Sequence, residues 1–320
     1  MRTVQLSHTD ATVSCLALGT LRFGTLRSYD EAAQLLNIYT EAGGNFLDTA
    51  NCYNQWAANG KGGESETTIG RWLQERGNRE DIFIASKVGF GCGDIPDGLA
   101  AKTIITSCEE SLRRLGTDHL DLFYGHKDDL NTPLEETLAA FSQLIEAGKI
   151  RFAGASNYLA WRLADADAIA TAKNLTPFTC VQQRFTYLRP QPGGYFYPQR
   201  LIDENLATYC DARGKTMLPY TPLLRGAYVR PERPIAESYQ GPDTDARLAA
   251  LQEVCQETGA TPNQVVLAWM LQRQPPMLPI FSAGTADHLR ENLGAVSLTL
   301  SEAQMTKLTM AGHCPNQEPN

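Results

Sequence analysis

The sequence lacks any long apolar run. No stretch approaches the roughly 18 unbroken apolar residues of a membrane-spanning helix. The first ten residues, MRTVQLSHTD, also lack the basic start followed by an apolar core that marks a secretory signal. We therefore expect a cytoplasmic protein without a membrane partner.

Positive charge is not in excess either. Lys and Arg total 28 against 36 Asp and Glu, which gives a formal charge of −8. Proteins that bind along nucleic acids need a basic surface to neutralise phosphates, so we expect no nucleic-acid partner. No pattern in the sequence indicates an oligomeric state.

The cysteines show neither paired spacing nor a nearby histidine at metal-ligand spacing. This distribution predicts no disulfide framework and no metal site, and it fits reduced thiols in a cytoplasm. The 8 cysteines are Cys15, Cys52, Cys92, Cys108, Cys180, Cys210, Cys255 and Cys314.

A repeated alternation of short β-rich runs and helical patterns fills the chain of 320 residues, of which 42% are apolar. Each run is rich in β-branched and aromatic residues and precedes a stretch with apolar residues at helical spacing. The runs are Val13–Thr20, Asn45–Ala50, Asp81–Val88, Leu120–His126, Ile150–Asn157, Phe178–Phe185, Lys215–Leu223 and Met277–Ala283. The helical stretches are Tyr29–Ala42, Glu64–Arg76, Thr103–Leu115, Pro133–Gly148, Tyr158–Ala172, Arg200–Arg213, Thr244–Glu257 and Pro262–Arg273.

Several of the runs are apolar almost throughout, as in Leu120–Tyr124, which is typical of strands buried on both faces of a parallel sheet. Eight strand-helix units favour a closed (β/α)₈ barrel over an open sheet. We predict an α/β fold with one such barrel domain over residues 1–320 and an extra C-terminal helix. Residues Val4–Leu6 and Thr12–Cys15 are expected to form a hairpin that plugs the barrel's N-terminal end.

Ionisable residues fall at the predicted carboxyl ends of neighbouring strands, where such barrels carry their chemistry. Asp48 ends the second run, Lys87 the third and His126 the fourth, and Tyr53 follows Asp48 in the next loop. Taken singly, the Asp–Lys pair could be structural and the histidine a core residue. Their coincidence at successive strand ends favours one catalytic site.

Tyr53 is the predicted proton donor of that site. A lysine charge about 4 Å away contributes about 4 kcal/mol at an effective dielectric of 20, enough to lower a tyrosine pKa by up to about three units. Asp48 would offset part of that effect. Tyr53 would then act as general acid and base, with a neutral His126 orienting a carbonyl oxygen.

The sequence resembles the aldo-keto reductase superfamily along nearly the whole chain. The matching segments are AGGNFLDTANCYN, GGESETTIGRWL, IFIASKVG, HLDLFYGHKDD, GKIRFAGASNY, VQQRFTYL, LPYTPLLRG and HLRENL. The resemblance implies a barrel that binds a nicotinamide cofactor without a Rossmann fold and reversibly reduces carbonyl groups. It also places the family's catalytic tetrad on Asp48, Tyr53, Lys87 and His126.

The resemblance further implies cofactor-binding residues. Ser156, Asn157 and Gln182 match the contacts of the cofactor carboxamide, and Tyr220 matches the aromatic residue that stacks on the nicotinamide ring. The remaining implied contacts are Thr20, Leu21, Asp48, Thr221, Pro222, Leu223, Leu224, Gly226, Ser282, Gly284, His288, Glu291 and Asn292.

One departure from the family concerns the ribose 2′-phosphate. Where members that prefer NADPH carry Lys or Arg, this chain reads Ser282, Ala283 and Gly284, with His288 in place of a later arginine. An arginine fork binds a phosphate strongly. We expect NADP(H) with weakened preference, with Arg290 or His288 as partial substitutes and NAD(H) as the alternative.

Aromatic residues are expected to line the substrate pocket. The insertion NQWAANGKGG after Tyr53 could bring Trp56 to the rim, together with Phe90 and Tyr187; a surface loop is the other interpretation of the insertion. The rims carry no charge cluster, which favours bulky neutral carbonyls that are sugar-like, steroid-like or aromatic. The expected partner is thus a small-molecule carbonyl or alcohol.

Two functions remain open from the sequence. The first is an NAD(P)(H)-dependent oxidoreductase that interconverts a carbonyl and its alcohol. The alternative is a cofactor-sensing regulatory subunit on the same fold with slow or no turnover.

Overall fold

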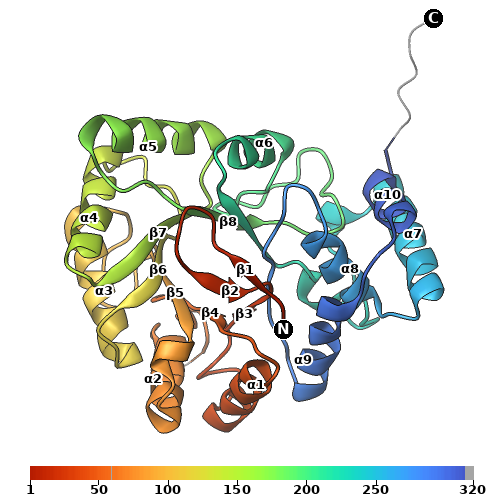
Figure 1. The fold of residues 1–320 in the computed structure, drawn as a ribbon, viewed down its shortest axis with the longest axis horizontal. Coiled ribbons are helices and arrows are strands. Elements are labelled where there is room, and N and C mark those ends of the chain that lie inside the picture. Colours follow the sequence, from red (N-terminus) through yellow and green to blue (C-terminus); the bar gives the residue numbers. More distant parts are fainter. Residues whose placement is uncertain (59, 314–320) are drawn as a thin grey trace, which may run out of the picture.

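Eight parallel strands close into a barrel in the computed structural model, which describes residues 1–58 and 60–313 (Figure 1). β10 closes the ring by pairing with both β3 and β9. The predicted (β/α)₈ barrel is confirmed. Its strands are β3 (Ala17–Gly19), β4 (Phe46–Asp48), β5 (Phe83–Val88), β6 (Leu120–Gly125), β7 (Ile150–Ser156), β8 (Cys180–Arg184), β9 (Thr216–Tyr220) and β10 (Ile280–Phe281).

Helices surround this ring (Figure 1). They are α1 (Tyr29–Glu41), α2 (Glu64–Arg76), α3 (Ala101–Leu115), α4 (Leu134–Glu146), α5 (Ala160–Lys173), α6 (Glu204–Ala212), α7 (Pro242–Thr258), α8 (Pro262–Leu271), α9 (Ala286–Leu293) and α10 (Glu302–Met310). The expected C-terminal helix is α10, which packs on α7. Among the described residues, no helix is long and apolar enough to cross a membrane.

Local sequence signals explain where several helices begin and end. Ser28 forms a capping box with Glu31 at the start of α1. Gly77 ends α2 with φ of 61°, a left-handed conformation that glycine adopts without strain. The predicted helix from Arg200 begins later, at Glu204, because Leu201 pairs with the end of β8 and Asp203 caps the helix.

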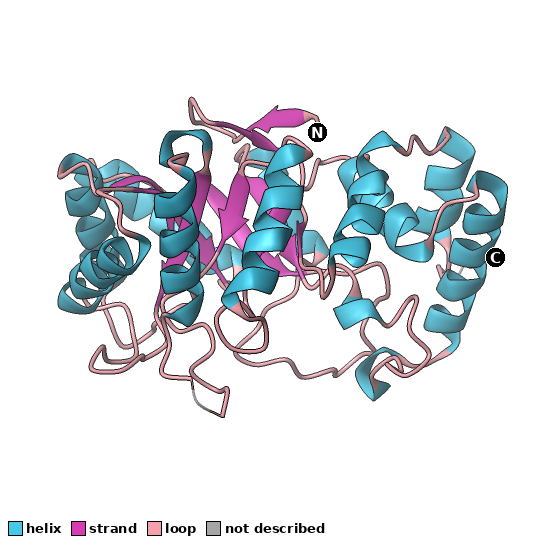
Figure 2. Ribbon diagram, turned by 90° about the horizontal axis from the view of Figure 1, so that it is seen from below, coloured by secondary structure: helices cyan, strands magenta, loops and turns pink. Residues whose placement is uncertain are grey.

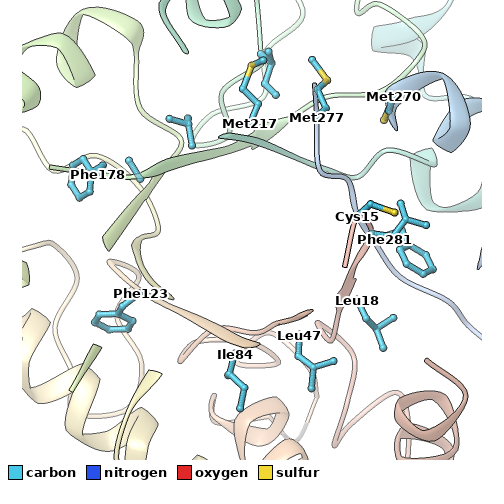
Figure 3. Packing of buried hydrophobic residues seen from close by; sticks show 14 of the residues in the cluster. Cys15, Leu18, Leu47, Ile84, Phe123, Phe178, Met217, Met270, Met277 and Phe281 are labelled. Atoms are coloured by element: carbon cyan, nitrogen blue, oxygen red, sulfur yellow. The ribbon is translucent and has the colours of Figure 1, made fainter. Parts of the chain in front are cut away.

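Successive strand residues point alternately into the barrel and toward the helices. In Figure 3, Leu18, Leu47, Ile84 and Phe123 point outward from the ring of strands into the main core. Their strand neighbours form a second cluster inside the barrel, which includes Ala17, Phe46, Phe83, Ala85, Leu122, Tyr124 and Leu218. With this alternation of period two, Asp48 and Lys87 fall on the inner face.

A hairpin closes one end of the barrel. Strands β1 (Thr3–Gln5) and β2 (Thr12–Ser14) pair antiparallel and lie over the barrel axis, at the end opposite the long loops (Figures 1 and 2). Leu6, Ala11 and Val13 belong to the inner cluster and seal that end. The expected N-terminal hairpin is confirmed.

The described cysteines Cys15, Cys52, Cys92, Cys108, Cys180, Cys210 and Cys255 are free thiols. Cys314 lies outside the described residues, as does Asn59 of the insertion after Tyr53.

Candidate active site

A buried lysine and aspartate on paired strands form the centre of the site. Asp48 ends β4, and Lys87 lies near the end of β5. Lys87 Nζ donates to Asp48 Oδ1 at 2.6 Å, to Thr49 O at 2.6 Å and to Tyr53 Oη at 2.9 Å. The three acceptors match the three ammonium protons. The buried charge is therefore fully hydrogen-bonded, and one of its bonds reaches a phenol.

Tyr53 and His126 join the pair from two loops. Tyr53 lies in the turns after β4, and His126 directly follows β6. The centroids of their rings are 6.0 Å apart, and Tyr53 Oη lies 3.5 Å from Asp48 Oδ1. The structure thus brings together the four residues proposed from their positions at strand ends.

The pKa of Tyr53 shifts in the direction opposite to the one expected from the sequence. Burial and the negative charge of Asp48 raise it well above its usual value, whereas we expected Lys87 to lower it. Asp48 lies so close to Lys87 that it cancels much of the lysine's field, and the desolvation of the phenolate then dominates. Tyr53 is therefore a protonated phenol at neutral pH.

His126 is a neutral imidazole. Burial and the nearby Lys87 charge hold its pKa well below the usual value, in agreement with the expected neutral state. Burial also raises the pKa of the Cys52 thiol to about 12, so that thiol keeps its proton. Cys52 Sγ lies 3.8 Å from His126 Nδ1. A thiol proton directed at Nδ1 favours the tautomer with its own proton on Nε2.

Hydroxyl groups hold the end of β4 in place. Thr20 Oγ1 donates to Asp48 O at 2.9 Å, Ser65 Oγ donates to Thr20 O at 2.9 Å, and Thr49 Oγ1 donates to Ser65 Oγ at 2.9 Å. Thr20 was assigned to the cofactor by the resemblance, but its side chain is fully buried in this network. Leu21 beside it is 39% exposed.

The residues matched to carboxamide contacts also bond to one another, to Asp48 and to His126. Asn157, with φ of 62°, donates to His126 O at 2.8 Å and accepts from Tyr220 Oη at 2.7 Å. It also donates to Ser156 Oγ at 3.0 Å. Gln182 Nε2 donates to Asp48 Oδ2 at 2.8 Å. These contacts fix the ends of β7, β8 and β9 around the tetrad.

The segment after β9 has an unusual backbone. Thr221, Leu224 and Arg225 have φ of 59°, 45° and 60°, and Gly226 has φ of 95°. Non-glycine residues in this region store strain, which persists where a loop must hold a defined shape for function. Pro222 O accepts from Thr186 Oγ1 at 3.0 Å, and Leu223 is buried. The segment therefore fits the loop that the resemblance assigns to the pyrophosphate.

Two arginines and His288 surround Gly284. A Cβ placed on Gly284 would lie 3.2 Å from Arg27 Nη2, 3.7 Å from Arg230 Nη2 and 3.8 Å from His288 Nδ1. Arg230 Nη2 itself lies 2.8 Å from His288 Nδ1. The glycine thus leaves open a small cradle lined by two guanidinium groups and an imidazole, which suits a phosphate.

Further arginines extend this positive region. Burial, followed by repulsion from Arg233, Arg225, Arg27 and Arg230, lowers the pKa of Arg22. Within the described residues, Arg27 has one distant carboxylate, Glu31 at 3.8 Å, and the other four form no salt bridge. We refer to Arg22, Arg27, Arg225, Arg230 and Arg233 as the arginine cluster.

Sequence reasoning missed the arginine cluster. The only signal was the density of arginine in LLRGAYVRPER, residues 223–233, because Arg22 and Arg27 come from a distant loop. Of the two residues that we named as partial substitutes for the phosphate-binding arginine, one lies at the cradle and the other does not. Arg290 pairs with Asp287 on its own helix at 3.3 Å and is 59% exposed, so it does not join the cradle, whereas His288 does.

In the last turn of α9, which we had expected to be the start of this helix, the two residues matched to adenine contacts bond to α8 and its cap. Glu291 accepts from Thr261 Oγ1 at 2.8 Å, and the buried Asn292 accepts from Asn263 Nδ2 at 3.3 Å. Ser282 is exposed in the loop before this helix.

Two of the three aromatic residues expected at the substrate pocket contact the tetrad. The Trp56 ring lies edge-on to Tyr53 at 6.3 Å, and Phe90 lies edge-on to His126 at 4.8 Å. Tyr187 does not line this site. It is buried in the core against Trp269, and its hydroxyl donates to Arg247 O. Its aromatic character alone could not distinguish a core residue from a rim residue.

Comparison with known proteins agrees with this geometry. A family model described as the aldo/keto reductase family matches residues 15–312. The chain belongs to the aldo/keto reductase family. Members of this family are oxidoreductases that use nicotinamide cofactors.

Individual relatives and a solved structure give the same family. Norsolorinic acid reductase A of Aspergillus parasiticus is 30% identical over 92% of this chain and 77% of its own length. An aryl-alcohol dehydrogenase of Pestalotiopsis microspora is 27% identical over 87% of this chain and 71% of its own. A thermostable aldo-keto reductase solved with the inhibitor epalrestat has a TM-score of 0.75 and 29% identity, over 96% of this chain and 98% of that one.

Proposed function

We propose that this protein reversibly reduces an aldehyde or ketone to an alcohol. The observation that carries the proposal is the three-way hydrogen bonding of Lys87, which ties the Tyr53 hydroxyl to a buried and fully paired ammonium. When bound, a reduced nicotinamide supplies hydride to the carbonyl carbon. The carbonyl oxygen then needs a proton.

Tyr53 would deliver that proton. Its phenol is protonated at neutral pH because burial and Asp48 raise its pKa, and Lys87 Nζ at 2.9 Å would stabilise the phenolate left behind. Neutral His126 would donate from Nε2 to the same carbonyl oxygen and orient it. In the reverse direction, the phenolate would accept the alcohol proton.

We further propose an aromatic carbonyl as the substrate. Trp56 and Phe90 contact Tyr53 and His126, so they can flank a planar ring at the reacting oxygen. Trp56 is 59% exposed and therefore free to cover such a ring. The name of one relative, an aryl-alcohol dehydrogenase, points to the same class.

A substrate panel tests both statements. We expect aryl aldehydes and aryl ketones to oxidise the reduced cofactor, followed by its absorbance, faster than aldoses of equal carbonyl reactivity. Faster turnover of aldoses would contradict the aromatic assignment. Tight cofactor binding without turnover of any carbonyl would instead support the regulatory-subunit alternative.

For the cofactor, we propose NADP(H) over NAD(H). The arginine cluster supports this, because a 2′-phosphate is the group that distinguishes the two cofactors and the cradle at Gly284 is lined by Arg27, Arg230 and His288. Arg27 has only the distant Glu31 at 3.8 Å and Arg230 has no salt bridge among the described residues, so both guanidinium groups favour a phosphate dianion over a hydroxyl. This replaces the weakened preference that we expected from the loop sequence alone.

Cofactor affinities test this assignment. We expect Arg27→Ala and Arg230→Ala each to weaken NADPH binding at least about tenfold, since one charge-assisted hydrogen bond contributes that much, and to change NADH binding little. Arg290→Ala is the matched control, because Arg290 bonds only to Asp287 on an exposed helix. Equal losses for both cofactors, measured by fluorescence titration, would contradict the assignment.

A further inference from the structure

Gln182 bridges the inside of the barrel. It lies on β8, which stands opposite β4 in the ring of eight strands, and its Nε2 donates to Asp48 Oδ2 at 2.8 Å. Asp48 thus uses Oδ1 for Lys87 and Oδ2 for Gln182. We infer that Gln182 is a positioning residue that acts through Asp48 on Lys87 and Tyr53, an inference that rests on the proposed carbonyl reduction.

The bridge controls both the orientation and the charge of Asp48. Oδ1 accepts from Lys87 and, at 3.5 Å, from the Tyr53 hydroxyl, whereas Oδ2 accepts from Gln182, so the carboxylate cannot rotate to present both oxygens to Lys87. A donor on Oδ2 also draws negative charge toward that oxygen, away from Oδ1, which faces Lys87 and lies 3.5 Å from Tyr53 Oη. Gln182 therefore weakens the field with which Asp48 opposes loss of the Tyr53 proton.

Few other groups act on this centre. The carboxylate closest to Lys87 and Tyr53 is Asp48, with Glu66 acting on Lys87 from behind β5. The other titratable groups that face the centre are neutral near pH 7, because burial raises the pKa of Cys52, Tyr124 and Tyr220 and lowers that of His126. Neighbouring charges therefore do not mask the effect that a change in the hydrogen bonding of Asp48 has on Lys87 and Tyr53.

Binding the cofactor and positioning Asp48 are compatible roles for one amide. A glutamine has two N–H donors and one carbonyl acceptor, and the bond to Asp48 uses one donor. The second N–H and Oε1 are the groups left for the carboxamide contact implied by the family resemblance, and the amide also interacts with the Tyr124 hydroxyl. The two roles can then be separated, because one affects cofactor affinity and the other the chemical step.

The test is a double-mutant cycle. We expect Gln182→Leu to lower kcat about tenfold, the value of one hydrogen bond to a charged group. The same change should have little further effect in an Asp48→Asn background, because the charge that it acts through is gone. Gln183→Leu is the matched control: this neighbouring glutamine is also buried, but it donates to Tyr158 O rather than to Asp48. It should leave kcat unchanged in both backgrounds.

Gln182→Glu keeps the side-chain length and should make kcat depend on pH. A protonated glutamic acid can donate to Asp48, whereas the ionised form repels it, so kcat of this variant should recover as the pH falls. Additive effects of Gln182→Leu and Asp48→Asn, or a Gln182→Leu loss confined to the cofactor dissociation constant, would overturn the inference. So would a Gln182→Glu profile that matches the parent protein.

A measurement on the free protein separates this inference from the proposed reaction. In Gln182→Leu the charge returns to Asp48 Oδ1, so the pKa of Lys87 should rise, and the ¹³Cε shift of labelled lysine reports it without turnover. Lys87→Arg would assign the resonance. An unchanged Lys87 pKa in Gln182→Leu would contradict the inference even if carbonyl reduction is confirmed. A raised Lys87 pKa would support the inference even if no substrate is found.

Discussion

The two faces of β5 carry two buried ion pairs with different roles. On the inner face Lys87 bonds to Asp48, and both side chains are almost fully buried. On the outer face the neighbouring Ser86 donates to Glu66 of α2, and Glu66 accepts from Arg114 Nε of α3 at 2.6 Å. One strand thus separates a pair that bonds to the Tyr53 hydroxyl from a pair that joins two helices to the barrel.

The choice of cation explains the difference. An arginine keeps its charge under all ordinary conditions, so Arg114 can only serve as a fixed partner. Burial lowers the pKa of Lys87, and its third proton reaches Tyr53 rather than a structural acceptor. We conclude that changes on the inner face should alter chemistry, whereas changes on the outer face should alter stability.

Removing the Tyr53 hydroxyl should have the largest effect. We expect Tyr53→Phe to lower kcat by about 10²–10⁴-fold, the usual contribution of a positioned general acid, with little change in cofactor affinity. Single-turnover and steady-state reduction of an aryl aldehyde would measure it. A variant as fast as the parent protein would mean that another group supplies the proton, and the inner face would lose its assigned role.

Breaking the outer pair should instead destabilise the fold. Glu66→Gln leaves the Arg114 guanidinium with Glu110, at 3.6 Å, as its remaining carboxylate, and we expect it to lower the free energy of unfolding by about 2 kcal/mol, the value of a hydrogen bond between charged groups. Urea unfolding would measure the loss, and kcat of the folded fraction should stay within about twofold. Asp48→Asn is the corresponding change on the inner face. It should lower the free energy of unfolding by less than Glu66→Gln does, because Lys87 can release its proton.

Much of this arrangement could be predicted from the sequence. The repeated runs predicted the barrel strands, and the rule that chemistry lies at their carboxyl ends singled out Asp48, Lys87 and His126. Periodicity succeeded here because these strands are short and buried on both faces. It could not place Tyr187, since an aromatic residue fits a core and a rim equally well.

Features that depend on distant contacts could not be predicted. Arg27 and Arg230 meet at Gly284 although about 200 residues separate them in the chain, and no local pattern encodes such a meeting. The predicted direction of the Tyr53 pKa shift was wrong for a similar reason. It depends on how closely Asp48 approaches Lys87 and on how deeply the phenol is buried, and both are tertiary quantities.

The pH dependence of stability sharpens the comparison, because His126, which follows β6, lies next to Tyr53 beside the inner pair and is titratable. The pKa of His126 is lowered in the fold, so below the usual value near 6.5 the unfolded chain binds more protons than the folded one. This group's contribution is full above about pH 6.5 and is lost as the pH falls, at most about 1.4 kcal/mol per pH unit. Urea unfolding from pH 7.5 to 5 should show this slope in the parent protein and a smaller slope in His126→Asn. Equal slopes in the two proteins would show that His126 titrates alike in the folded and unfolded states.

The smallest effect is expected at Ser86, the outward neighbour of Lys87. Ser86→Ala removes one donor to the Glu66 carboxylate, so we expect a loss of about 1–2 kcal/mol in the free energy of unfolding. Although Ser86 is bonded covalently to Lys87, kcat and its pH profile should match the parent protein, because the Lys87 ammonium bonds only on the inner face. Urea unfolding and steady-state kinetics on the same preparations would give both values. A tenfold loss of kcat without a change in stability would show that the two faces are coupled through the strand, and the division between a catalytic and a structural ion pair would then fail.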